Sequence, residues 1–151
     1  MKDTTKAYIA GLIDGEGCIA ITRRKVKRLK TGYWYYEPQV IVANTDKKMI
    51  DFLVDYYSGY VVIGQKQKEH HKQSYHWKMT GDNMRQLLRD VSPYLILKKK
   101  QANLILSFPR YSGNGHKCRT DTERQEQEDL WLAVKKLNKK GILSERHSVA
   151  R

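Results

Sequence analysis

Cysteines, acidic residues and long apolar runs are all scarce in this chain of 151 residues. Only two cysteines occur, Cys18 and Cys118, and they form no CxxC pair. This pattern argues against a disulfide framework or a zinc ribbon and favours a reducing compartment. No apolar run approaches the roughly 18 residues of a membrane helix, and the first six residues lack a signal-peptide pattern. We therefore expect an intracellular protein without membrane contact, and the sequence leaves its compartment open.

The shortage of acids leaves a net charge of +13 and a pI near 9.7. An excess of this size favours a polyanionic partner, most simply nucleic acid. Segment 23–30 holds six basic residues and no acid, whereas segment 121–129 holds five acids. Charge sorted in this way predicts one basic surface and a different opposite face, not a uniform coat.

Hydrophobic periodicity and turn residues predict helices that alternate with antiparallel hairpins. The expected helices run from a Thr4 or Thr5 cap through Ile13 to a stop at Gly15/Gly17, from an Asp46 cap to Ser58, from an Asp82 cap to Pro93, over 96–108, and over 122–141 with Gly141 as the stop. The expected strands cover 18–30, 33–44, 60–68 and 74–80. This order predicts one α+β domain over residues 1–141 with four antiparallel strands, followed by a flexible tail over 142–151.

Alternation along these strands separates a core-facing set of side chains from an outward-facing set. The outward face mixes Arg, Lys, Gln, Glu, Thr, Ser and His, which are side chains that hydrogen-bond base edges. The residues expected to bind DNA there are Thr22, Arg24, Arg28, Tyr35, Glu37, Gln39, Lys66, Lys68, Ser74, His76 and Lys78. Any solvated sheet face is polar, but six basic residues in eight positions of one hairpin favour the major groove of DNA.

One face of the first expected helix is almost bare of side chains. The residues Ala7, Ala10, Gly11 and Asp14 recur at helical spacing and form one stripe. A stripe of small residues allows a second helix backbone to approach closely. Packing within the chain is one explanation, but no second stripe of this kind followed by an acid occurs in the sequence. A symmetric partner that presents the same helix is the more economical explanation, so we expect this stripe to form a dimer interface.

Two acids, Asp14 and Glu16, stand where the first helix ends. The helix C-terminus carries partial negative charge, so acids at this position disfavour folding and hint at a function. A hard divalent cation would resolve the conflict, because Mg²⁺ takes one or two carboxylates together with water and phosphate oxygens. Plain solvation of two exposed acids near a turn is the alternative.

The run Ile9-Ala10-Gly11-Leu12-Ile13-Asp14-Gly15-Glu16-Gly17 closely resembles the LAGLIDADG signature of homing endonucleases. It departs from that signature at three positions, with Ile9 for Leu, Gly15 for Ala and Glu16 for Asp. The resemblance extends over roughly residues 5–140 in element order and basic hairpins. It implies an αββαββα domain with a saddle-like antiparallel sheet and C-terminal helices. Because family members with one motif act as homodimers, the single motif here implies a homodimer.

The resemblance also implies a site-specific, Mg²⁺- or Mn²⁺-dependent endonuclease that cuts a long, nearly palindromic duplex and leaves short 3′ overhangs. The final acid of the family motif binds the catalytic metal, so Glu16 takes that role, and the carbonyl of Gly15 shares in coordination. Asp14 is expected to support the helix interface. Three weaker matches complete the expected catalytic set: Asn44 and Lys48 in the network that orders water, and Lys98 as the basic residue that stabilises transition-state charge.

Two other classes of protein are compatible with parts of this pattern. The same fold serves in DNA-binding regulators and in RNA maturases that help to splice their own intron, so binding to intron RNA is a further expectation. A structural basic protein is a poor alternative, because it needs neither the bare stripe nor the acids that follow it. Metal-dependent cleavage separates these classes, and the sequence does not name the target site.

Overall fold

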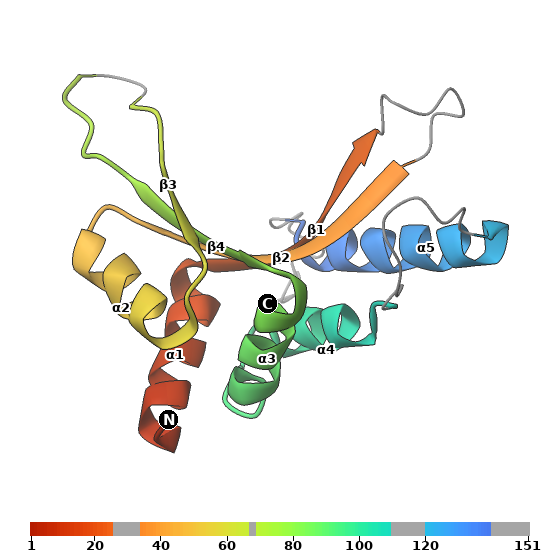
Figure 1. Ribbon diagram of the computed structural model, residues 1–151, viewed down its shortest axis with the longest axis horizontal. Coiled ribbons are helices and arrows are strands. Elements are labelled where there is room, and N and C mark those ends of the chain that lie inside the picture. The colour runs from red at the N-terminus through yellow and green to blue at the C-terminus, as the bar shows by residue number, and fades with distance from the viewer. Residues whose placement is uncertain (26–33, 67–68, 110–119, 140–151) are drawn as a thin grey trace, which may run out of the picture.

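The fold consists of two hairpins in one sheet with helices that precede, separate and follow them (Figure 1). The computed structural model describes residues 1–25, 34–66, 69–109 and 120–139. Its elements are α1 (Asp3–Glu16), β1 (Gly17–Lys25), β2 (Trp34–Asn44), α2 (Lys47–Tyr57), β3 (Tyr60–Ile63), β4 (Tyr75–Thr80), α3 (Gly81–Val91), α4 (Lys99–Ser107) and α5 (Asp121–Leu137). This order confirms the predicted α+β class.

The four strands form one antiparallel sheet in the order β1-β2-β4-β3. Each hairpin pairs its own strands, and the two hairpins join where β2 pairs with β4. Figure 1 shows both hairpins rising away from the helices on opposite sides, so that the sheet is bent like a saddle. The helices lie on one side of this sheet, which leaves the other side as an open concave face.

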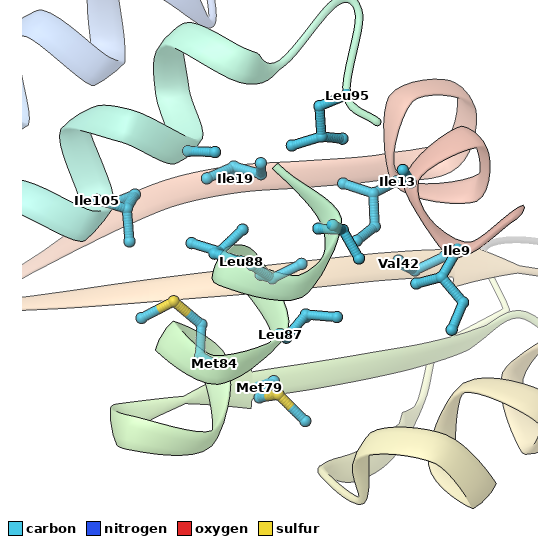
Figure 2. Packing of buried hydrophobic residues seen from close by; sticks show 14 of the residues in the cluster. Ile9, Ile13, Ile19, Val42, Met79, Met84, Leu87, Leu88, Leu95 and Ile105 are labelled. Atoms are coloured by element: carbon cyan, nitrogen blue, oxygen red, sulfur yellow. The ribbon is translucent and has the colours of Figure 1, made fainter. Parts of the chain in front are cut away.

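The core lies between the sheet and the helices (Figure 2). Its fully buried members come from alternate positions of the strands and from one face of each packed helix, as the sequence periodicity predicts. They include Ile9, Ile13, Ile19, Val40, Val42, Leu53, Trp77, Leu87, Leu88 and Ile105. Figure 2 shows Leu87 and Leu88 of α3 in the same cluster as Ile9 and Ile13 of α1. The core therefore fixes α1 against the centre of the sheet.

Several predicted boundaries are wrong. Helix α1 starts after Lys2, so Thr4 and Thr5 lie inside it, whereas its end at Glu16 agrees with the expected stop at Gly15/Gly17. Helix α3 is preceded by Thr80, and Asp82 stands in its first turn, where an acid complements the helix dipole. Strand β3 ends at Ile63 and not at Lys68, and α4 starts at Lys99 and not at residue 96.

The start of α2 follows the predicted capping chemistry. The carboxylate of Asp46 accepts a hydrogen bond from the backbone N–H of Lys48 and caps α2 as expected. The start of α5 lies one residue before the expected 122, and a capping box of Thr120 and Glu123, which was not predicted, forms it. The expected stop at Gly141, the tail over 142–151 and strand positions 26–30 lie outside the described residues. Among the described residues no helix is long and apolar enough to cross a membrane.

Packing among α1, α2 and α3 includes a polar contact between Tyr57 and Asp90. The Tyr57 hydroxyl donates to a carboxylate oxygen of Asp90 at 3.2 Å, and the Lys6 ammonium lies 3.8 Å from the other oxygen. Burial, with the charge of Asp90 beside it, raises the pKa of Tyr57 well above its ordinary value. The hydroxyl therefore stays protonated and keeps donating.

A buried arginine closes the C-terminal end of α4. Arg85 is 7% exposed, and its guanidinium donates to the carbonyls of Ile105, Leu106 and Phe108 at 3.4, 3.1 and 2.6 Å. Leu106 lies in the last turn of α4, where carbonyls find no partner within the helix, whereas the Ile105 carbonyl also accepts from the backbone N–H of Phe108. Arg85 thus joins α3 to α4, and through α4 it supports the segment that precedes that helix.

We expect Arg85→Met to lower the free energy of unfolding by about 3 kcal/mol, because it removes the guanidinium that donates to the carbonyls of Leu106 and Phe108. Thermal denaturation followed by circular dichroism measures this loss. Arg89→Met removes the same group from an exposed position of the same helix and serves as the control. Equal melting temperatures for the two variants would contradict the role assigned to Arg85.

Candidate active site

The candidate active site lies where α1 ends and β1 begins. No loop intervenes, because Gly17 follows the last helical residue and is already the first residue of β1. A Cβ at Gly17 would lie 2.6 Å from the carbonyl oxygen of Ile13 and 2.8 Å from its Cα. Only glycine allows the chain to leave the helix so tightly, and this sharp exit holds Glu16 at the surface.

Asp14 has intramolecular partners that its sequence position did not indicate. Its carboxylate accepts hydrogen bonds from the backbone N–H groups of Ile96, Leu97 and Lys98, at 2.7, 3.2 and 2.9 Å. These donors immediately precede α4, so the Asp14 carboxylate lies beside the partial positive charge of that helix start. An acid at the end of α1 is therefore compensated by the start of another helix, which answers the conflict that the sequence posed.

The side chain of Lys98 also contacts the C-terminal end of α1. Its ammonium donates to the backbone carbonyl of Asp14, one of the carbonyls that the end of α1 leaves unpaired. Lys98 is separated from Asp14 by 84 residues in sequence. Of the predicted catalytic residues, the structure thus brings Lys98 to the helix end that carries Glu16.

Glu16 and Gly15 remain accessible to a metal ion. Both are exposed, and no described contact engages the Glu16 carboxylate. The described residues contain no group of three or more His, Cys, Asp or Glu that could hold a metal. One carboxylate and a nearby carbonyl suit Mg²⁺, which keeps several waters and takes its other ligands from phosphate oxygens. The donor set fits a cation that is completed by substrate.

Asn44 and Lys48 are less clearly placed in this site. The Asn44 side-chain oxygen accepts from the backbone N–H of Asp46 at 2.8 Å and shapes the turn into α2. Asn44 shares the strand parity of Val40 and Val42, which face the core. Lys48 lies exposed in the first turn of α2, and no described contact joins it to α1. Their catalytic roles stay predictions.

The bare stripe of α1 differs from the predicted one. Ala10 is fully buried in the core, so its assignment to a dimer interface is wrong. Ala7 and Gly11 are exposed as expected, and Gly15 continues the exposed stripe. A Cβ added at Gly11 or Gly15 would meet nothing within 4 Å, so packing within the described chain does not explain either glycine.

Large apolar side chains surround the exposed stripe. Tyr8 is 55% exposed and packs edge-on against Phe52 of α2, with ring centroids 5.3 Å apart. Ile96 and Leu97, whose backbone N–H groups bind Asp14, are 84% and 71% exposed. We call the exposed positions Tyr8, Gly11, Gly15, Ile96 and Leu97 the α1 face. It is apolar and lies beside Asp14 and Glu16.

The β1–β2 part of the concave face carries four of the predicted DNA-binding side chains. Thr22 pairs with Glu37 and Arg24 pairs with Tyr35 across the two strands. The Thr22 hydroxyl donates to the carbonyl of Glu37 at 3.1 Å, and the Arg24 guanidinium donates to the Glu37 carboxylate at 3.0 Å. The side chain of Arg24 is 63% exposed, so it remains free to reach a ligand.

Gln39 does not fit the predicted pattern of exposure. It lies on the outward parity between Ala20 and Thr80, yet it is only 4% exposed, and its Oε1 has no hydrogen-bond partner. Its expected place among open base-reading side chains is therefore wrong for this conformation.

The β3–β4 part of the face carries the second predicted group. The Ser74 hydroxyl and His76 Nε2 lie 3.2 Å apart, and the Lys78 ammonium lies 5.9 Å from the ring centre of Tyr60. Lys66 is exposed but lies beyond the end of β3, so the strand does not set its orientation. Arg28 and Lys68 lie outside the described residues.

Sequence reasoning missed the role of Arg23. It was counted only among the six basic residues of the hairpin, but strand parity turns it toward the core side. There its guanidinium donates to Glu128 of α5 at 2.7 Å. The available signal was the alternation of the strand, because position 23 shares the parity of the core-facing Ile19 and Ile21.

Comparison with known proteins identifies the family. The family model described as LAGLIDADG endonuclease matches residues 9–112, which is more than half of the chain. The chain belongs to the LAGLIDADG endonuclease family. A search of the curated proteins found no match.

Solved structures confirm the LAGLIDADG fold. The archaeal intron-encoded homing endonuclease I-Vdi141I, complexed with DNA, superposes with a TM-score of 0.73 at 15% identity, covering 96% of this chain and 91% of that one. The homing endonuclease I-CvuI, in complex with the I-CreI target, gives 0.68 at 20% identity over 93% and 86%. The meganuclease I-CpaMI, bound to uncleaved DNA, gives 0.55 at 17% identity, covering 66% of this chain but 34% of that chain.

Proposed function

We propose that this LAGLIDADG endonuclease is a homodimer that cuts both strands of DNA at one long, nearly palindromic site. The observation that carries the proposal is the α1 exit, where Glu16 is exposed and the Lys98 ammonium donates to the Asp14 carbonyl, at the end of a helix that lies beneath the sheet. Family membership supports the nuclease activity. The structural neighbours complexed with DNA support a duplex as the ligand of the concave face.

The concave face suits a duplex in shape and chemistry. A two-stranded ribbon fits the major groove, and the two hairpins would place Arg24 and Lys78 in successive parts of one half-site. Polar contacts to phosphates would position the duplex, and contacts to base edges would specify it. The net charge of +13 supplies the salt-dependent part of the affinity.

A second copy would complete the active site. One chain offers one motif and one free carboxylate at the helix exit, whereas cutting two strands needs two such sites. The glycines at 11 and 15 each cost a helix about 1 kcal/mol relative to alanine, without a steric reason inside the described chain. Close approach of a second α1 supplies that reason, and the apolar side chains of the α1 face would be covered with it.

In the proposed reaction, Glu16 and the Gly15 carbonyl would hold Mg²⁺ or Mn²⁺, which supplies an activated water and charge stabilisation when bound. Lys98 would place a positive charge near the scissile phosphate, where negative charge develops. Asp14 holds the backbone of 96–98 and so keeps Lys98 at the helix exit. Two exits related by a dyad would cut the strands with a stagger, which we expect to leave short 3′ overhangs.

Cleavage of a randomised duplex library, with Mg²⁺ and separately with Ca²⁺, tests this proposal. Cuts that appear with Mg²⁺ at one nearly palindromic site, with short 3′ overhangs, would support the nuclease, the dimer and the polarity together. Selective binding without cutting under either cation would contradict the nuclease and favour a DNA-binding regulator. Mn²⁺ in place of Mg²⁺ tests the choice of metal.

The dimer has a test of its own in Gly11→Leu. A Cβ at position 11 meets nothing within 4 Å among the described residues, so the isolated subunit should be at least as stable as the wild type, by up to about 1 kcal/mol. It would, however, keep two α1 backbones apart. We expect the variant to sediment as a monomer where the wild type sediments as a dimer, and to lose double-strand cutting.

Gln125→Leu is the matched control for this variant. It adds the same side chain at an exposed position of α5, far along the chain from the stripe. A Gly11→Leu protein that still sediments as a dimer would contradict the interface, and a monomeric wild type would contradict the dimer itself.

A further inference from the structure

Helix α5 packs against the core-facing side of the β1–β2 hairpin (Figure 1). The match to the family model ends at residue 112, so α5 lies beyond it. Near its C-terminal end, Asn138 donates to the Ile19 carbonyl of β1 at 2.8 Å. The contacts of α5 therefore extend along β1 from its buried end toward the hairpin tip.

One carboxylate of α5 binds both strands of the hairpin. Glu128 Oε1 accepts from the Arg23 guanidinium of β1 at 2.7 Å, and Oε2 accepts from the Tyr36 hydroxyl of β2. Arg23 and Tyr36 are direct partners in the β1–β2 pairing. Glu128 thus contacts both members of one cross-strand pair, Arg23 and Tyr36, from the side of the sheet that faces the helices.

Aromatic rings enclose the same guanidinium. The Arg23 guanidinium carbon lies 3.9 Å from the ring centre of Trp34 in β2 and 4.4 Å from that of Trp131 in α5. The side chains of Arg23 and Glu128 are 24% and 28% exposed, so water only partly screens their attraction. An arginine fixed between two rings and a carboxylate has little rotational freedom.

The two cross-strand pairs beside this one carry side chains that are predicted to bind DNA on the concave face. On one side Thr22 pairs with Glu37, and on the other side Arg24 pairs with Tyr35. Because successive side chains alternate between the faces, a fixed orientation of Arg23 on the core side fixes Thr22 and Arg24 on the other. The brace therefore acts at the centre of the candidate recognition surface of this hairpin.

We propose that Glu128 is a positioning residue for DNA recognition: with Arg23, Tyr36 and Trp131 it fixes the β1–β2 hairpin so that Arg24 and its neighbours read their base pairs in one orientation. The inference rests on the proposed function, because it gives α5 a part in sequence discrimination. Glu128 itself touches no DNA, since it lies on the side of the sheet that faces the helices.

The first test needs no DNA. We expect Glu128→Ala to raise backbone amide hydrogen exchange in β1 and β2 and to leave exchange in β3 and β4 unchanged. Glu126→Ala removes the same charge from an exposed position two residues away and is the matched control. Unchanged exchange in the β1–β2 hairpin of Glu128→Ala would overturn the brace.

The second test uses the duplex that the wild type selects from a randomised library, together with its single-base variants, bound in Ca²⁺. Arg24→Ala first identifies the base pairs that this hairpin reads. At those positions we expect Glu128→Ala to lower discrimination by about fivefold, which is the lower end of what one good base contact supplies. Discrimination between base pairs at the other positions should stay at the wild-type level. In Glu126→Ala, discrimination should stay at the wild-type level at every position.

Each outcome decides a different point. Raised exchange with unchanged discrimination would make Glu128 merely structural and overturn its positioning role. Partial recovery in Glu128→Gln, which keeps one acceptor oxygen, would support the hydrogen-bond geometry over the charge. A wild type that selects no duplex would refute the proposed function, and the exchange experiment would still decide whether α5 braces the hairpin.

Discussion

Glu16→Gln is expected to abolish cleavage, with a fall of about a thousandfold or more, while the protein still folds and binds DNA. The glutamine keeps the size of the side chain but removes the only free carboxylate that the described helix exit offers to a metal. Without a held cation, the reaction loses both the activated water and the stabilisation of developing charge. Single-turnover cleavage of the selected duplex, compared with binding in Ca²⁺, measures the two effects separately.

The same Glu16→Gln substitution should make the fold slightly more stable. Glu16 is the last residue of α1, where a negative charge opposes the partial negative charge of the helix end. Its neutralisation should raise the free energy of unfolding by about 0.3–1 kcal/mol. A variant that is slightly more stable but inactive indicates that Glu16 is retained for its chemistry and not for the fold.

Glu126→Gln provides the matched control, because it makes the same substitution at an exposed position of α5. It should leave cleavage and stability close to those of the wild type. Near-normal cutting by Glu16→Gln would contradict its assignment as the metal ligand. Loss of binding together with cutting would instead place Glu16 in the DNA contact.

Local signals in the sequence were sufficient for the element order and for the motif. Period-two alternation placed Ile19, Val40 and Trp77 in the core, and the Asp46 cap of α2 was read from side-chain chemistry alone. Errors at boundaries arose where two residues could each serve as a cap. Thr80 and Asp82 are an example, because both types favour a helix start.

Contacts between distant segments were beyond sequence reasoning. Asp14 looked unfavourable at the end of α1 because nothing local shows that the N–H groups of residues 96–98 meet it. Arg23 looked like one more basic residue of a hairpin because its partner Glu128 lies 105 residues away. In the same way, Ala10 belonged to a plausible stripe until the packing of α1 buried it. Periodicity gives the face of a helix, but only the fold gives what covers it.

Asp14→Asn is expected to have the second large effect, on both stability and cleavage. The carboxylate accepts from three successive backbone N–H groups, whereas an asparagine has one acceptor oxygen and turns an NH₂ group toward the remaining donors. Hydrogen bonds to a charged acceptor contribute about 1.5–3 kcal/mol, and the contacts to Ile96 and Leu97 are exposed. We therefore expect the free energy of unfolding to fall by about 2 kcal/mol.

Cleavage should fall as well, because the segment that Asp14 holds carries Lys98. The Lys98 ammonium bonds the Asp14 carbonyl, so its position depends on the same junction of α1 and α4. A double-mutant cycle with Lys98→Met tests this dependence: if Asp14 acts through Lys98, the two losses in the rate of cleavage should not add. Asp55→Asn, at an exposed position of α2, is the control for removal of one acid from a helix.

Unfolding of the Gly11→Leu protein distinguishes a role of Asp14 within one chain from a role between two copies. If Asp14 acted only between two copies, Asp14→Asn would weaken association and leave the unfolding of the monomeric Gly11→Leu protein unchanged. The three intramolecular hydrogen bonds predict the opposite. Asp14→Asn should lower the free energy of unfolding by the same amount in the Gly11→Leu monomer as in the wild-type protein. Fully additive losses with Lys98→Met would show that Asp14 and Lys98 act independently. Asp14 would then affect cleavage by a route other than the position of Lys98.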